Sequence, residues 1–182
     1  YKFNKPNGIG KKQWVHVIDC PDPFREVNPK YQIDEILKKL KSKKRGLACF
    51  ISEIFPSVAG QIIPQDGIMS YIYKKVKKAG GICIADEVQT GLGRLGDFYF
   101  GFEQQKVDPD IVVLGKPIGN GHPIGVVITT EEIAKSFDNG IEFFSTFGGS
   151  DLSCLIANEV LKIVDDENLK SNAKKNGRYF NK

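Results

Sequence analysis

The chain has 182 residues, of which 41% are hydrophobic and 26% are charged. This composition is typical of a globular protein and excludes a disordered or fibrous chain. The apolar runs are much shorter than a membrane span, so no membrane partner is expected. The net charge of +4 comes mainly from a basic run at residues 38–45. That run lacks the interleaved aromatic residues of a nucleic-acid surface, so we expect a solvated helix end and no nucleic-acid partner.

The single methionine and the cysteines bear on what kind of chain this is. The chain begins with Tyr1, and its one methionine is Met69. Because an open reading frame starts with methionine, we expect either that processing has removed a segment or that the chain is a piece of a longer protein. The four cysteines have no pairwise spacing typical of a zinc site, so no metal is expected. We expect them to be reduced, buried thiols in an intracellular compartment; they are Cys20, Cys49, Cys83 and Cys154.

Taken in chain order, the predicted elements alternate between strands and helices. Helices are indicated by hydrophobic residues three and four positions apart, and strands by short apolar runs between turn residues. Strands are predicted at residues 14–18, 47–55, 82–85, 111–114 and 123–130. Helices are predicted at residues 33–40 and 68–79, in a short segment just after residue 129, and at residues 151–164. The strands are apolar throughout, which favours a sheet buried on both faces. We therefore predict an α/β fold with a mostly parallel sheet sandwiched by helices.

Polar residues stand at three of the predicted strand ends, namely Glu53, Asp86 and Lys116. In sheets of this kind, ligands bind beyond the carboxyl ends of the strands. A carboxylate at the edge of a core requires a cation or a hydrogen-bond donor, and an amine held against an apolar sheet is a strong nucleophile. From the residues alone, Asp86 and Lys116 either belong to a catalytic site or form a structural ion pair.

Three segments carry a resemblance to a known family: residues 82–94 (ICIADEVQTGLGR), 109–116 (PDIVVLGK) and 145–150 (STFGGS). They resemble the aspartate, lysine and phosphate-loop motifs of class III aminotransferases, which are pyridoxal 5'-phosphate (PLP) enzymes of fold type I. The motifs occur in the family's order, and the match runs from about residue 50 to the C-terminus. The resemblance implies PLP as cofactor. It also implies that residues 1–182 form part of the large, cofactor-binding domain, and that its N-terminal part and the small C-terminal domain lie outside them.

The resemblance also implies roles for single residues. Lys116 matches the lysine that forms the Schiff base with PLP and then acts as general base, and Asp86 matches the aspartate that pairs with the pyridinium nitrogen. Gln89 matches the residue near the ring hydroxyl. Thr146 matches the threonine that binds the cofactor phosphate of the neighbouring subunit, which implies a homodimer with shared sites. Glu53 matches an acid beside the cofactor, with either a direct or a purely structural role.

A finer resemblance concerns the reaction. Residues 115–123 (GKPIGNGHP) resemble the alanine-glyoxylate aminotransferase 2-like branch, which includes phospho-lyases. Val58 stands where many omega-aminotransferases have a second glutamate. The first hypothesis is therefore elimination of phosphate from a phosphorylated amine, giving an aldehyde and ammonia. The alternatives are transfer of an amino group from a small amine to a keto acid, and a truncated, inactive product. The branch implies an intracellular location, with the mitochondrion as one option.

The sequence departs from the family pattern beside the phosphate loop. Ser150 and Asp151 follow the loop where the family usually has Asn-Pro, and Asp151 is expected to cap the next helix. His122 is expected to be a loop residue whose polar atoms are satisfied by the backbone. Arg94 is expected to brace its loop or a subunit contact.

Overall fold

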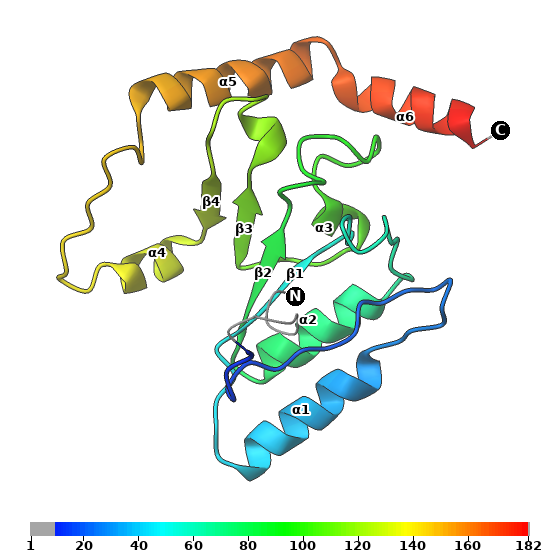
Figure 1. Cartoon of the computed structure of the whole chain (residues 1–182), viewed down its shortest axis with the longest axis vertical. Coiled ribbons are helices and arrows are strands. Elements are labelled where there is room, and N and C mark those ends of the chain that lie inside the picture. The colour runs from blue at the N-terminus through cyan, green and yellow to red at the C-terminus, as the bar shows by residue number, and fades with distance from the viewer. Residues whose placement is uncertain (1–9, 182) are drawn as a thin grey trace.

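A computed structural model describes residues 10–181, and its centre is a four-stranded sheet (Figure 1). The strands are β1 (Cys49–Glu53), β2 (Ile82–Asp86), β3 (Ile111–Leu114) and β4 (Val126–Thr129), and they lie in the order β1-β2-β3-β4. The first three are parallel, and β4 runs antiparallel to β3. The predicted α/β fold with a mostly parallel sheet is therefore confirmed.

Helices precede, separate and follow these strands. They are α1 (Lys30–Ser42), α2 (Ile68–Lys78), α3 (Gly101–Gln104), the short 3-10 turn η2 (Lys116–Ile118), α4 (Glu131–Phe137), α5 (Asp151–Asp166) and α6 (Leu169–Phe180). In Figure 1, α1 and α2 lie together at one end of the molecule, and α5 and α6 form a rod at the opposite end. No helix within residues 10–181 is long and apolar enough to cross a membrane.

The core lies on one face of the sheet. Cys83 and Ala85 of β2 are completely buried and pack with the apolar side chains of α2. Val112 and Leu114 of β3 are buried on the same face, together with residues of α5. On the opposite face, Ile51 of β1 keeps 59% of its surface exposed. Within the described part of the chain, burial of both faces is therefore incomplete, contrary to the prediction.

Several local predictions were wrong. Residues 14–18 form no strand: no strand within residues 10–181 pairs with them, and Trp14 is 73% exposed. The spacing of Thr129 and Glu132 predicts a capping box for the helix after residue 129. The cap of α4 is instead the Thr130 side chain, which accepts a hydrogen bond from the Ile133 amide. Cys83 is buried as expected, but Cys49 and Cys154 are exposed. The helices α3 and α6 were not predicted, because α3 has only four residues and most residues of α6 are polar.

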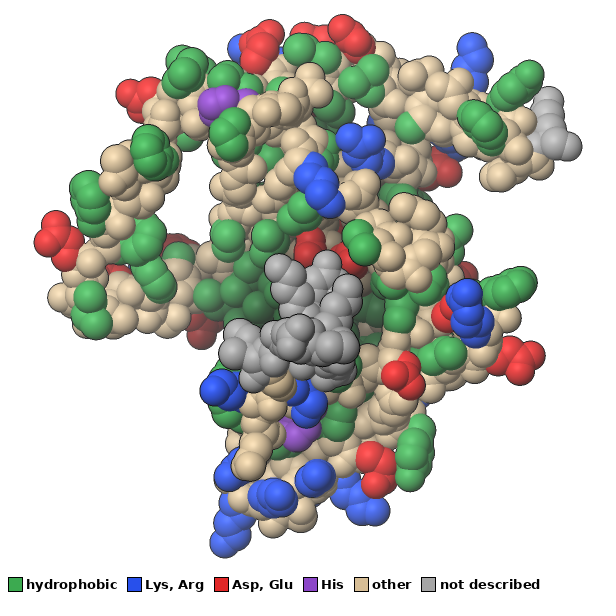
Figure 2. Space-filling model, in the orientation of Figure 1, with side chains coloured by type: hydrophobic (Ala, Val, Ile, Leu, Met, Phe, Trp, Pro, Cys, Tyr) green, Lys and Arg blue, Asp and Glu red, His purple; other side chains and the backbone are tan. Residues whose placement is uncertain are grey.

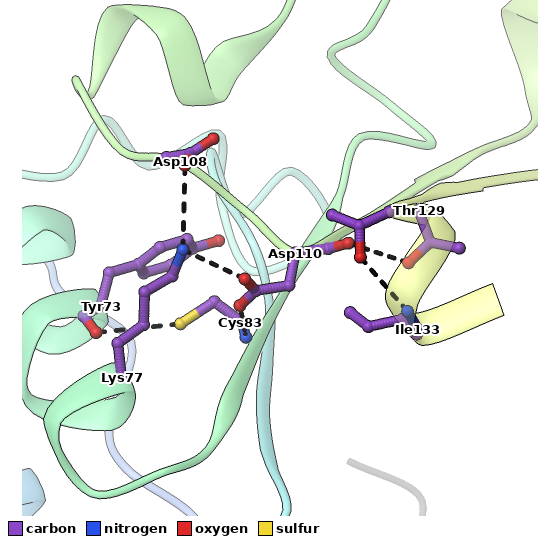
Figure 3. Close-up of polar contacts among 8 residues, drawn as sticks. Tyr73, Lys77, Cys83, Asp108, Asp110, Thr129 and Ile133 are labelled. Atoms are coloured by element: carbon purple, nitrogen blue, oxygen red, sulfur yellow. Dashed lines mark hydrogen bonds and ion pairs between the residues drawn. The ribbon is translucent and has the colours of Figure 1, made fainter. Parts of the chain in front are cut away.

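Asp110, just before β3, joins three elements of the fold (Figure 3). Its carboxylate accepts a hydrogen bond from the Cys83 amide at 2.7 Å and pairs with the Lys77 ammonium at 3.1 Å. Its backbone carbonyl accepts a hydrogen bond from the Thr129 hydroxyl at 3.0 Å. Asp110 therefore links β2, α2 and β4 at the end of the sheet opposite Lys116, which gives this motif residue a structural role.

Candidate active site

The parallel strands bring the predicted site residues to one edge of the sheet. Glu53 is the register partner of Asp86, and Asp86 is the register partner of Val113. Lys116 follows Val113 by three residues, immediately beyond the end of β3. Because register partners point to the same face, the two carboxylates lie side by side on the less covered face of the sheet. Residues far apart in sequence are thus gathered where ligands bind in such folds.

Lys116 is held by an amide side chain. Its ammonium donates a hydrogen bond to Gln89 Oε1 at 2.6 Å. The backbone of Lys116 has φ +36°, a left-handed conformation that is uncommon for a residue with a side chain and often marks a functional position. Lys116 is exposed, so the expected placement of its amine against the apolar sheet was wrong. The structural ion pair between Asp86 and Lys116 is not formed either.

The carboxylates of Asp86 and Glu53, at the carboxyl ends of β2 and β1, have different hydrogen-bond partners. One oxygen of Asp86 accepts a hydrogen bond from the Val88 amide at 3.0 Å, and the side chain is only partly buried. Glu53 Oε2 accepts hydrogen bonds from both the amide and the hydroxyl of Ser57, at 3.0 and 2.8 Å. These contacts favour a structural role for Glu53. They leave Asp86 as the carboxylate able to meet a cationic ligand group.

Glu87, the neighbour of Asp86, was given no role by sequence reasoning. It is completely buried, its Oε2 accepts a hydrogen bond from the Thr90 hydroxyl at 2.5 Å, and its Oε1 accepts one from the Phe102 amide at 2.8 Å. Burial raises the pKa of the Glu87 carboxyl, and the hydrogen bonds from Thr90 and from the Gly101 and Phe102 amides act against this rise. The sequence did contain one signal that could have identified Glu87, namely a charged residue at the end of an apolar strand.

Thr146 does not join the other site residues within the chain. It is exposed in the segment between α4 and α5, which extends away from the sheet (Figure 1). This segment carries large exposed side chains, and Figure 2 shows hydrophobic atoms along it; they are Ile141, Phe143, Phe144 and Phe147. Such a surface is typical of a segment that packs against another part of a protein or a second chain.

The remaining predicted residues lie around the turn η2. The ring of His122 forms a hydrogen bond with the Ser153 hydroxyl at 2.8 Å, so its partner is a side chain of α5 and not the expected backbone. Arg94 is exposed and lines a pocket of about 280 Å³ between its loop, η2, α5 and α6. Asp151 is the first residue of α5, whose N-cap is Ser150, and it makes no capping hydrogen bond. The predicted cap was therefore wrong.

The donor set at this edge fits the chemistry of PLP. Lys116 offers an accessible amine to an aldehyde, and Asp86 offers a carboxylate to a cationic ring nitrogen. Gln89 already contacts the amine and offers an amide to a ring hydroxyl. No described group of three or more His, Cys, Asp or Glu residues is arranged to hold a metal ion.

Comparison with known proteins gives consistent results. The family model described as "Aminotransferase class-III" matches residues 8–182. A Drosophila melanogaster protein named alanine-glyoxylate aminotransferase 2-like is 45% identical over 99% of this chain and 39% of its own length. The human mitochondrial alanine-glyoxylate aminotransferase 2 is 36% identical over 99% of this chain and 39% of its own length.

A solved structure is similar over nearly the whole chain. It is a phospholyase from Arthrobacter in complex with phosphoethanolamine, with a TM-score of 0.83 and 32% identity, covering 97% of this chain and 43% of that one. The chain thus spans about two fifths of the length of the curated relatives it matches, 39% of each of the two named above. The class III aminotransferase family is PLP-dependent. With the family model matched over residues 8–182, this chain belongs to the class III aminotransferase family.

Proposed function

We propose that the protein containing this chain is a PLP-dependent phospho-lyase, which eliminates phosphate from a phosphorylated amine and yields an aldehyde and ammonia. The observation that carries the proposal is the contact of 2.6 Å between Lys116 and Gln89, beside Asp86 at the same strand edge. The likeness to a phospholyase in complex with phosphoethanolamine supports this choice of reaction and substrate class. Val58, at the position of a second glutamate in many omega-aminotransferases, also supports it.

The chain's own residues would divide the work as follows. Asp86 and Gln89 bind and orient the cofactor, which when bound supplies a sink for the electron pair released by deprotonation. The Lys116 amine removes the proton from the substrate carbon that bears the amino group. The bond between the adjacent carbon and the phosphate oxygen then breaks, and phosphate leaves with the bonding electrons. Water hydrolyses the remaining enamine to the aldehyde and ammonia.

The test uses the full-length protein with PLP and phosphoethanolamine. We expect release of inorganic phosphate without any keto acid present. Lys116→Ala should lower the rate at least about 100-fold, since general acid–base catalysis contributes about that much or more. Lys106→Ala is the matched control, because Lys106 is also an exposed lysine with a left-handed backbone, at φ +53°. Equal rates for the two variants would exclude Lys116 as the base.

Amino transfer is the second candidate reaction. It is favoured by the two relatives that are named as alanine-glyoxylate aminotransferases. In that reaction Lys116 would move the same proton, and a keto acid would accept the amino group. Amino transfer to a keto acid without phosphate release would exclude the lyase and support this alternative. Absence of cofactor binding by the 182-residue chain itself, in an absorbance scan with PLP, would support the truncated, inactive product.

The organisation of the whole protein is also part of the proposal. We propose that residues 1–182 form part of a large cofactor-binding domain, and that two chains form a homodimer with Thr146 serving the partner's site. We also propose an intracellular location, with the mitochondrion as one option that the name of the human relative supports. Cell fractionation with an antibody to this chain tests the location. The coding sequence on both sides tests the domain assignment.

A further inference from the structure

We propose that Glu87 is a positioning residue for Lys116, acting through the turn that carries Gln89. The turn comprises residues 87–90 and follows β2 directly. This inference rests on the proposed function, which gives Lys116 its importance. It goes further by assigning a role to a buried carboxylate that touches neither the cofactor nor the substrate in that scheme.

Glu87 is anchored to the sheet through its backbone. Its amide donates a hydrogen bond to the Val113 carbonyl at 2.9 Å, and its carbonyl accepts one from the Gly91 amide at 2.9 Å. The first bond continues the parallel pairing of β2 with β3 by one residue. The turn is therefore attached to β3 only three residues before Lys116.

The carboxylate of Glu87 connects this turn to a distant part of the chain. One oxygen accepts the Thr90 hydroxyl at 2.5 Å, within the turn, and the other accepts the Phe102 amide at 2.8 Å, at the start of α3. Because the side chain is completely buried, water cannot replace these donors. An aliphatic side chain at position 87 would leave the Thr90 hydroxyl and the Phe102 amide without this partner.

The same turn contacts both Lys116 and the residue before it, Gly115. Gln89 accepts a hydrogen bond from the Lys116 ammonium at 2.6 Å. The Val88 side chain packs so closely on Gly115 that a Cβ atom added there would lie 3.2 Å from it. Val88 and Gln89 lie between Glu87 and Thr90, whose side chains are hydrogen-bonded to each other. Loss of that hydrogen bond and of the bond to Phe102 would therefore let Gln89 move away from Lys116. Glu87 and Thr90 thus fix the place of the lysine without contacting it.

The experiment measures the accessibility of the Lys116 amine by labelling the full-length protein without cofactor. An amine-reactive reagent is used, and mass spectrometry follows the peptide containing Lys116. We expect Thr90→Val and Glu87→Ala to raise the labelling rate about three- to tenfold, the equivalent of one net hydrogen bond. Gln89→Ala, which removes the contact itself, is the positive control.

Conservative variants separate positioning from general damage. Thr90→Ser keeps the hydroxyl, and Glu87→Gln can accept from the Phe102 amide while donating to the Thr90 hydroxyl, so both should label at the wild-type rate. Glu103→Ala is the matched control. Its carboxylate accepts hydrogen bonds from the Tyr99 and Phe100 amides beside α3, but has no bond to the turn. It should leave the rate unchanged.

With PLP bound, the pH midpoint of the cofactor's visible absorbance band is the second measurement. Thr90→Val should shift the midpoint in the same direction as Gln89→Ala, whereas Thr90→Ser should not shift it. Wild-type labelling in Thr90→Val, together with faster labelling in Gln89→Ala, would overturn the proposal, even where Glu87→Ala does not fold. A wild-type protein that shows no cofactor band would count against the proposed function. The labelling result would still decide on Glu87.

Discussion

At the scale of single residues, Glu87 shows how burial changes the behaviour of a carboxyl group. Burial raises its pKa in the folded chain, so the folded state binds a proton at a pH where the unfolded chain has lost it. The contribution of the Glu87 carboxyl to the free energy of unfolding is therefore fully present below its usual pKa of 4.5. It is lost as the pH rises through the pKa that the carboxyl has in the folded chain. Each unit of pKa rise corresponds to about 1.4 kcal/mol.

Glu87→Gln should remove this dependence, because the amide does not titrate and keeps the shape of the side chain. We expect the free energy of unfolding of the variant, relative to wild type, to increase as the pH rises above 4.5. Chemical denaturation at a series of pH values measures it. A difference between the two proteins that stays constant or falls over this range would contradict the assignment.

At the scale of elements, Asp110 joins strands and a helix that the chain order leaves separate. Asp110→Ala removes the partner of the Cys83 amide and of Lys77, and should lower the free energy of unfolding by about 1–3 kcal/mol, the cost of an unsatisfied partner. Asp108→Ala is the matched control, because Asp108 contacts the same lysine at 3.9 Å but is 99% exposed. Denaturation curves that coincide for the two variants would show that the network in Figure 3 has no special role.

The docking of α6 depends on a glycine in the loop after β2. A Cβ atom added at Gly96 would lie 2.8 Å from the Lys174 backbone, and its φ is +80°. The same loop and helix are joined by an ion pair between Asp97 and Lys174. Because glycine has no side chain, Gly96 allows the backbone of α6 to lie directly against the loop.

Gly96→Ala should displace α6 and speed hydrogen exchange in that helix, with a cost of about 1–3 kcal/mol for forcing the added methyl group into the contact. Gly140→Ala is an informative control, because Gly140 has the same φ of +80° and no atom within 4 Å of the added Cβ. Gly140→Ala therefore measures only the effect of placing an alanine at a positive φ. Equal effects in both variants would remove close packing as the reason for a glycine at position 96.

At the scale of the whole molecule, the structure does not bring Thr146 to the other predicted site residues. Lys116, Gln89 and Asp86 lie together, whereas Thr146 is exposed on a segment that leads away from the sheet (Figure 1). The exposed phenylalanines of that segment favour a partner surface, and the proposed homodimer would supply it.

Mixing two inactive variants tests this arrangement. In a dimer of Thr146→Ala with Lys116→Ala, one site would combine an intact lysine with an intact threonine from the other chain. Random pairing should therefore restore about one quarter of the wild-type sites. Activity and cofactor absorbance of the refolded mixture are compared with those of each variant alone. If the mixture gives only the sum of its parts, Thr146 does not serve the partner's site.

The sequence by itself determined the strands β2 and β3 and the residues at their ends. Short apolar runs ended by glycine and charged residues identify buried parallel strands, and parallel strands place their carboxyl ends at one edge. The strand ends alone therefore identify Asp86 and Lys116 as candidate site residues. Gln89 was named only because the motifs resemble those of the class III aminotransferases, a family that the comparison confirms.

The tertiary structure decided what depends on neighbours. Residues 14–18 have the pattern of a strand, but they form none because no strand in the described part of the chain pairs with them. Lys116 was expected against apolar surface and is exposed, because this depends on which face of the sheet other elements cover. Glu87 was overlooked because its donors, Thr90 and the Phe102 amide, meet it only after the chain has folded back. Local patterns record which residues prefer burial, whereas partners distant in sequence are fixed by packing.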